Sequence, residues 1–328
     1  MFDLPGDDDV SPSKLGDGGP SSGTTTADLS VLTLVRNRNA MLARLVAGLV
    51  TAERPPTELV VAWCGGEDPH GVVESDLPFD VRVIEVGTGG ERIPYSHARN
   101  ECARTARSQA LAFLDADCIP GSRYPGALAD ALAQVDALCT GEVWYLPPDT
   151  LTSFAEADLR RIGRPHPHRE RPPSTGIALS SGHELVWGLH MAVRRSTFDG
   201  LGGFDESYQG YAGEDTDLAV AARSRGVPVA LVAGADVFHQ HHDVWEPPVQ
   251  QLEATLANAR RFHEKWGRWP MEGWLVELVD LGLIEWSLDG PTVRLLRQPD
   301  DRDLARAHRA SALPFRTQPG ERRPTTTG

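Results

Sequence analysis

The residues of this chain that are best suited to chemistry form two acidic clusters, one in each half of the sequence. In the first, the apolar run 111–114 leads directly into Asp115-Ala116-Asp117, and in the second, Gly210 and Gly213 precede Glu214-Asp215. Carboxylate oxygens are the hard ligands that Mg²⁺ and Mn²⁺ prefer, and either ion can neutralise a diphosphate. A carboxylate pair on a separate loop can supply a base for an incoming nucleophile. Together the clusters indicate a metal-dependent transferase acting on a nucleotide-activated substrate.

Each cluster also has a purely structural interpretation. Acidic pairs in turns are commonly just solvated, but Asp115 and Asp117 follow directly on an apolar strand, which favours a metal site. Glu214, Asp215 and Asp217 would also stabilise the N-terminus of a helix. The catalytic and the capping role are compatible, because a helix start is a rigid mount for a base.

Alternating strands and helices are expected to position the first cluster. Apolar runs predict strands at 29–35, 59–63, 81–86 and 110–114. Helical spacing predicts helices at 41–50 and at 97–106, the latter with Ser96 as N-cap. This order implies an α/β fold with a mainly parallel sheet, whose ligands bind at the carboxyl ends of its strands. Asp115 and Asp117 lie at one such end.

The second half of the chain has a less regular pattern. It predicts strands at 187–193, 229–232 and 235–238, helices at 215–226, 247–266 and 274–283, and a hairpin around Asp289-Gly290. The segment 164–173 is polar and broken by prolines. We interpret it as a mobile, solvated segment, with a lid over bound substrate as the alternative.

Composition sets the broad class of protein. A chain of 328 residues with 40% hydrophobic residues can bury one large core or two smaller ones. No apolar run approaches the length of a membrane span, and the acidic N-terminus is not a secretory signal. The net charge of −14 argues against nucleic acid as a partner, and the four cysteines lack metal-ligand spacing. We therefore expect a cytoplasmic enzyme with reduced thiols, with peripheral membrane association left open, and disordered tails at 1–27 and 316–328.

Four motifs in order resemble the GT-A glycosyltransferases, especially family 2. Residues 114–120 (Leu-Asp-Ala-Asp-Cys-Ile-Pro) are similar to the family's Asp-x-Asp region, and Ala98-Arg99-Asn100 matches a triplet found shortly before it. Residues 35–38 resemble the nucleotide-binding segment of β-1,4-galactosyltransferases, and 202–206 with 210–218 resemble the catalytic segment of galactosyltransferase-like members. The resemblance implies a GT-A domain at 28–245 and a helical C-terminal extension at 246–315.

The resemblance implies a metal site for Mn²⁺ or Mg²⁺. In the family the last Asp of Asp-x-Asp, here Asp117, binds the metal, while Asp115 faces ribose or metal. A histidine that ends the last strand completes the site in galactosyltransferase-like relatives, and His239 matches it best. We keep His241 in reserve, because strand alternation would put both imidazoles on one face. Imidazole suits Mn²⁺ better than Mg²⁺.

The resemblance also implies a binding site for the nucleotide sugar. Arg36, Asn37, Arg38 and Arg99 would contact base, ribose or diphosphate, where a guanidinium can form paired hydrogen bonds. For any single arginine, surface solvation is the competing interpretation. Many family-2 enzymes carry an Asp after the second strand to bind the nucleobase, and Asp68 is a displaced substitute. The donor base is therefore open, and UDP is favoured by analogy.

Aromatic residues supply candidate walls for the sugar and acceptor pockets. Trp187-Gly188 and Tyr211 are suited to this role, because aromatic rings stack on the apolar face of a pyranose. Core packing explains Trp187 equally well. Tyr211 lies in a glycine-flanked loop, which favours a functional role.

By its match to the family's Glu-Asp pair, Asp215 is expected to act as general base and Glu214 to bind sugar or acceptor hydroxyls. One displacement would invert the anomeric centre. The expected reaction transfers a hexose from a nucleoside-diphosphate sugar to a hydroxyl of a glycan, lipid-linked sugar, metabolite or peptide.

Two other functions fit parts of the sequence. A sugar-1-phosphate nucleotidyltransferase shares the sheet and the metal chemistry, but it needs a glycine-rich loop after the first strand, and residues 35–39 contain no glycine. A catalytically silent carbohydrate-binding protein would not need both acidic clusters.

Overall fold

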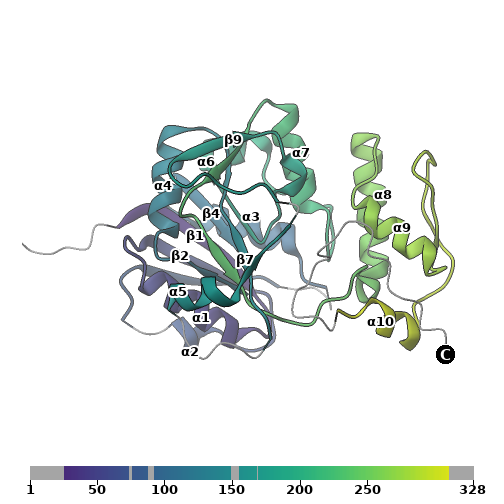
Figure 1. Cartoon of the computed structure of the whole chain (residues 1–328), viewed down its shortest axis with the longest axis horizontal. Coiled ribbons are helices and arrows are strands. Elements are labelled where there is room, and N and C mark those ends of the chain that lie inside the picture. The colour runs from purple at the N-terminus through teal and green to yellow at the C-terminus, as the bar shows by residue number, and fades with distance from the viewer. Residues whose placement is uncertain (1–25, 74–75, 88–91, 149–154, 168, 310–328) are drawn as a thin grey trace, which may run out of the picture.

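The computed structural model describes residues 26–73, 76–87, 92–148, 155–167 and 169–309. Their centre is an eight-stranded sheet in the order β3-β2-β1-β4-β10-β6-β11-β9, with helices on both faces (Figure 1). The α/β fold expected from the sequence is confirmed. Of the two tails expected to be disordered, 1–25 and 316–328 lie outside the described residues, whereas Ala27 begins the first strand.

The first half follows the predicted alternation. In order along the chain come β1 (Ala27–Val35), α1 (Asn39–Val50), β2 (Pro56–Trp63), the short α2 (His70–Val73), β3 (Asp80–Glu85), α3 (Tyr95–Thr105) and β4 (Ala110–Leu114). Strands β1 to β4 are mutually parallel where they pair. The prediction of Ser96 as N-cap is wrong. Helix α3 begins at Tyr95, two residues before the predicted start at 97, its N-cap is Pro94, and Ser96 is buried inside the first turn.

The side chains of β1 alternate between two cores, one on each face of the sheet. Val31 packs with α1 and with α4 (Tyr124–Gln134) on one face. Leu32 packs on the other face with α3, α6 (Arg195–Leu201) and α7 (Glu214–Ser224). Burial on both faces explains why the strand reads as a nearly continuous apolar run.

Two strands of the main sheet run against their neighbours: β10, inside the sheet, and β9, at its edge. β10 (His190–Arg194) is antiparallel to β4, with His190 opposite Leu114, and the backbone N–H of Asp115 donates to Leu189 O at 3.0 Å. The start of β10 therefore lies beside the end of β4. The prediction placed this strand at 187–193, but Trp187 and Gly188 form the turn before it. The sheet is completed by β6 (Leu138–Thr140), β11 (Val229–Val232) and β9 (Ile177–Ser180).

A second, four-stranded sheet includes the strand that follows β4 along the chain. It contains β5 (Cys118–Pro120), β12 (Val237–His239), β7 (Val143–Tyr145) and β8 (Arg164–Pro165). The last of these strands and the buried Arg169 anchor part of the segment 164–173 that we interpreted as mobile and solvated, whereas Glu170 and Arg171 within it are exposed. A short helix, α5 (Glu156–Ile162), lies just before it.

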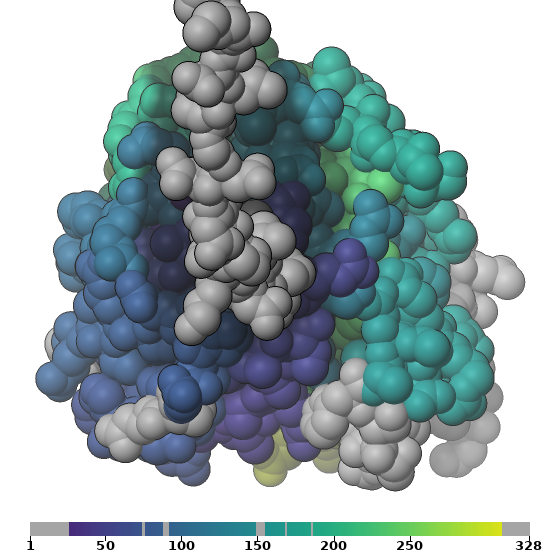
Figure 2. Space-filling view, turned by 90° about the vertical axis from the view of Figure 1, so that its left-hand side faces the viewer, coloured from purple at the N-terminus to yellow at the C-terminus, as the bar shows by residue number. Residues whose placement is uncertain are grey.

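The C-terminal extension has a hydrophobic core of its own. Its elements are α8 (Leu252–Trp266), α9 (Glu272–Asp280), the hairpin β13 (Ile284–Glu285) with β14 (Arg294–Leu295), and α10 (Asp301–Ala307). Helix α8 begins later than predicted, after Pro247, Pro248 and a short 3-10 turn, and α10 was not predicted. The extension lies beside the sheet domain (Figure 1), and from the opposite side it is almost hidden (Figure 2).

The described part of the chain contains no helix that is both long and apolar enough to cross a membrane.

Candidate functional site

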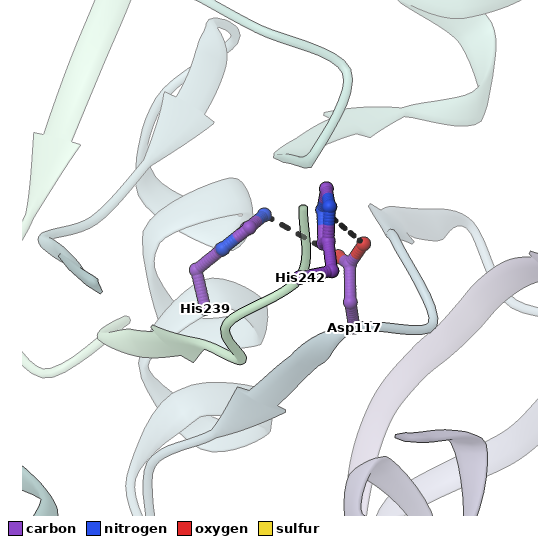
Figure 3. Close-up of side chains that lie close together, drawn as sticks. All are labelled: Asp117, His239 and His242. Carbon is purple, nitrogen blue, oxygen red and sulfur yellow. Dashed lines mark ion pairs between the residues drawn. The ribbon is translucent and has the colours of Figure 1, made fainter. Parts of the chain in front are cut away.

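Asp117, His239 and His242 form a group suited to holding a metal ion (Figure 3). One ligand atom from each residue lies within 4.8 Å of the others. The Nε2 atoms of His239 and His242 lie 3.7 and 3.4 Å from the two carboxylate oxygens of Asp117. Strand pairing produces this convergence, because His239 ends β12 opposite Cys118, the residue next to Asp117.

The third member is His242, whereas the sequence analysis kept His241 in reserve. That choice assumed that the strand continues, but β12 ends at His239. Gln240 then turns the chain: its N–H donates to Asp117 O at 2.7 Å, and its buried side chain bonds to Arg44 and to Met41 O. The turn brings His242 back to the carboxylate.

The chemistry of this group fits a divalent cation. Burial lowers the pKa of His239 to about 4, so its imidazole is neutral and has a free electron pair at neutral pH. Burial opposes ionisation of Asp117, but His239, His242 and Arg38 outweigh it and hold the pKa of that carboxyl well below its usual range. The Arg38 guanidinium also contacts the Asp117 carboxylate. One carboxylate and two imidazoles are a donor set that Mn²⁺ accepts.

Arg99 connects the two acidic clusters. The residue is 6% exposed, and its guanidinium donates to Glu214 Oε1 at 2.7 Å and to Asp115 Oδ1 at 3.2 Å. A side chain at Gly188 would not fit here, since a Cβ would lie 2.8 Å from an Arg99 nitrogen. Arg99 therefore contacts both clusters from inside the protein, which the sequence analysis did not foresee.

The carboxylates bound to Arg99 are harder to ionise than usual. Burial raises the pKa of Asp115 to about 6, against the attraction of Arg99. Burial and the neighbouring charge of Asp215 raise the pKa of Glu214 to about 7. Burial and the charge of Asp115 likewise raise the pKa of Tyr95 to about 12. The Arg99 guanidinium, which the two carboxylates share, therefore offsets only part of the free-energy cost of burying their charges.

Asp215 lies at the start of α7, beside the beginning of β10. Its Oδ2 accepts the N–H of Gly188 at 2.9 Å, and its Oδ1 accepts the N–H of Thr216 at 2.6 Å. Gly213 precedes the helix with φ of 103°, a conformation that favours glycine. The acid predicted to be the base is thus held by backbone amides of two elements.

The predicted pocket aromatics have different neighbours. Trp187 is half-buried, with the His166 ring edge-on at 5.1 Å and the Arg169 guanidinium over it at 5.1 Å. Tyr211 is 37% exposed and stacks on Trp274 of α9, with ring centroids 6.1 Å apart. The extension thus contacts the loop that carries Tyr211.

The predicted nucleotide-binding loops contact each other. Asn37 Oδ1 accepts the N–H of Glu67 at 2.9 Å, and Asn39 Nδ2 donates to Asp68 O at 2.8 Å. The Asp68 carboxylate accepts the N–H of His70 at 2.9 Å and is exposed. Arg36 is half-buried on the same loop as Arg38. Among the arginines singled out, Arg38 contacts the first acidic cluster and Arg99 contacts both.

Sequence reasoning missed three residues of this site: His242, Tyr95 and Asn258. A signal existed for Tyr95, which precedes Arg99 by one helical turn, and its ring lies 5.7 Å from that guanidinium. His242 was visible in the His-rich run but stood one residue beyond the reserve choice. Asn258 lies in α8, far along the chain, and no local pattern pointed to it.

Comparison with known proteins finds a matching family model and several similar proteins. The model of the glycosyltransferase-like family 2 matches residues 27–261. Validoxylamine A glucosyltransferase from Streptomyces hygroscopicus subsp. limoneus is 29% identical over 258 residues, which cover 72% of this chain and 56% of that protein. The O-antigen biosynthesis protein RfbC from Myxococcus xanthus is 25% identical over 225 residues, covering 65% of this chain and 17% of that protein.

Two solved structures are also similar. TarS from S. aureus superposes with a TM-score of 0.48 at 15% identity, covering 70% of this chain and 64% of that one. The mannosyltransferase PcManGT from Pyrobaculum calidifontis, solved with GDP-Man and Mn²⁺, superposes with a TM-score of 0.47 at 15% identity, covering 85% and 70%. This chain spans little more than half the length of the streptomycete relative, 56%.

Proposed function

The chain belongs to the glycosyltransferase-like family 2, and from that premise we propose that it is a metal-dependent, inverting hexosyltransferase. It takes the hexose from a nucleoside-diphosphate sugar, with UDP favoured, and transfers it to an acceptor hydroxyl. The family membership favours glycosyl transfer over the nucleotidyl transfer that the sequence left open. The cytoplasmic location expected from the sequence remains a prediction.

The observation that supports this proposal best is the contact of Arg99 with both acidic clusters. Arg99 bonds to Asp115, which lies two residues before the candidate metal ligand, and to Glu214, which directly precedes the candidate base. A glycosyl transfer needs charge stabilisation at the leaving group and a base at the nucleophile, on opposite sides of one sugar carbon. The buried Arg99 guanidinium links the two clusters, and this supports a site in which the metal ligands and the base act on one sugar carbon.

Asp117, His239 and His242 would hold Mn²⁺, with Mg²⁺ the weaker choice for imidazole ligands. When bound there, the ion supplies positive charge against the diphosphate of the leaving nucleotide. Arg38 contacts Asp117 from the loop after β1. Its guanidinium is therefore within reach of the same diphosphate, where paired hydrogen bonds can form.

Asp215 is the proposed general base. Backbone amides of Gly188 and Thr216 orient its carboxylate, and it removes the proton from the acceptor hydroxyl as this attacks the anomeric carbon. Glu214, whose pKa of about 7 lies well above the usual value, can retain a proton near neutral pH. It then offers both a donor and an acceptor to sugar hydroxyls.

The curated relatives bear on the donor sugar. The name of the streptomycete relative states that it is a glucosyltransferase acting on validoxylamine A. This favours a hexose donor for this chain and leaves the acceptor classes considered above in place.

A binding panel followed by product analysis tests the proposal. Thermal shifts of the full chain are measured with UDP, GDP and dTDP, each with and without Mn²⁺, because a ligand that binds the native state raises the melting temperature. We expect the largest shift with UDP and Mn²⁺ together. The anomeric proton coupling of the product then reports stereochemistry. A β-linkage from an α-linked donor supports inversion, whereas an α-linkage would remove Asp215 from its role as base.

A further inference from the structure

The loop 209–213 leads into the proposed catalytic pair and has an unusual backbone. Gly210, Ala212 and Gly213 all have positive φ, at 72°, 71° and 103°. Alanine rarely adopts such a conformation, because its Cβ is then strained against the backbone. A loop of this kind persists only where surrounding structure holds it, so its anchor determines where Glu214 and Asp215 lie.

Asn258 of α8 contacts this loop along its length. Its Oδ1 accepts the N–H of Gln209 at 3.2 Å. Its Nδ2 lies 3.2, 3.1 and 2.8 Å from the carbonyl oxygens of Gln209, Tyr211 and Ala212. Carbonyls only accept hydrogen bonds, so the amide nitrogen must face them and the orientation of the side chain is determined. Asn258 is 2% exposed.

Other contacts fix α8 against the same region. Lys265 Nζ lies 2.8 Å from Asp217 Oδ2, and the Trp266 indole N–H donates to Asp217 Oδ1 at 2.7 Å. The buried Phe262 packs with Tyr208. Asn258 therefore projects from a helix that is itself anchored, and can transmit that rigidity to the loop.

We infer that Asn258 is a positioning residue for glycosyl transfer: from the C-terminal extension it holds the loop 209–213, and through it the acceptor-side pair Glu214-Asp215 and the aromatic ring of Tyr211. This inference rests on the proposed function for its catalytic meaning. It also makes α8, which lies beyond the predicted domain boundary at 245, part of the catalytic unit.

The test compares three variants of the full chain. Asn258→Ala removes all four hydrogen bonds. Asn258→Asp keeps the shape and the acceptor for Gln209 but loses the donors to the three carbonyls. Arg260→Ala is the matched control, because Arg260 also lies on α8 and bonds to a backbone carbonyl, that of Val293, outside the loop.

We expect both Asn258 variants to lower kcat for transfer by about 10- to 100-fold, the usual effect of misplacing a catalytic group by about 1 Å. The Kd for the donor nucleotide with Mn²⁺ should stay within about twofold of wild type, because the metal group does not depend on this loop. Arg260→Ala should lower the melting temperature and leave kcat unchanged. Assays well below the melting temperature separate the two effects.

Hydrogen exchange gives a readout that does not need activity. Amides of 209–213 should exchange faster in both Asn258 variants and at the wild-type rate in Arg260→Ala. If Asn258→Ala does not fold, Asn258→Asp carries the same comparison. Unchanged exchange in an Asn258 variant, or faster exchange with wild-type kcat, overturns the inference. Absence of transfer by the wild type would refute the proposed function, and the exchange data would still decide whether Asn258 holds the loop.

Discussion

The two acidic clusters are mounted on different elements but share one design. Asp115 and Asp117 follow the end of a buried strand, whereas Glu214 and Asp215 open a helix after a loop with positive φ. In each pair one acid bonds to Arg99, and the other meets different partners. Asp117 faces two imidazoles, and Asp215 accepts backbone N–H groups.

This comparison assigns different tasks within each pair. The acid bound to Arg99 has part of its charge compensated inside the protein. Its neighbour keeps its charge for a ligand, a cation in the first cluster and an acceptor proton in the second. One buried guanidinium thus divides each close pair into a member that it holds in place, the structural member, and a reactive member. Glu214, although held in this way, can still contact sugar hydroxyls.

The largest effect is expected from the reactive member of the first cluster. Asp117→Ala should abolish Mn²⁺-dependent nucleotide binding, and with it transfer, because two imidazoles alone do not hold the ion firmly. Thermal shifts with UDP and Mn²⁺ provide the measurement. Undiminished Mn²⁺-dependent UDP binding by this variant would assign the metal to other residues.

Asp215→Asn should separate binding from chemistry in the second cluster. It keeps the shape and can still accept the N–H of Gly188, but it cannot take a proton. Transfer should fall by about 10²- to 10⁴-fold while donor affinity stays near wild type. Turnover close to that of the wild type would leave only the helix-capping role for Asp215.

A pair of histidine variants sharpens the account of the first cluster. His242→Ala should weaken Mn²⁺ binding at least about tenfold, because it removes a ligand atom. His241→Ala, on the adjacent residue, should change it little. Titration calorimetry with Mn²⁺ and UDP measures both, and the reverse order would mean that the turn after His239 differs from the one described.

The smallest effect concerns the structural member of the second cluster. The pKa of Glu214 is about 7 in the native state, against 4.5 as the ordinary value. Between these values the native state binds more protons than the unfolded state, so this group destabilises the protein progressively as pH rises through that window. Glu214→Gln should remove this dependence, at most about 3 kcal/mol near pH 8. Urea unfolding at pH 5 and pH 8 checks it, and parallel changes in both proteins would contradict it.

Local patterns in the sequence predicted the sheet and one side of the site. The strand at 110–114 matches β4 because five buried apolar residues precede Asp115 without interruption. Helix α3 was likewise predictable from its residue pattern, whereas the arginine that it carries was singled out by the family resemblance. These features depend on neighbours in the chain, which is why the strand and helix order of the first half was confirmed.

Features that depend on distant contacts could not be predicted in this way. His242, and not His241, lies beside Asp117 because a turn anchored by Gln240 follows the strand. The shared role of Arg99 depends on a partner 115 residues away in the chain. Helix α4 was not predicted, and Asn258 was missed because its partners lie 46 to 49 residues earlier in the chain.

The reversed strand β10 has a consequence for folding. It pairs with β4 at a separation of more than seventy residues, His190 with Leu114, and the hydrogen bond between Arg44 and Gln240 spans 196 residues. Contacts between distant parts of the chain are slow to form, because the loop entropy is lost before the contacts stabilise the fold. The metal group should therefore assemble late, after the first strands have paired. A chain still being synthesised and short of His239 has Asp117 but neither imidazole, so the proposed metal site cannot form before β12, the last strand of the two larger sheets, has been made.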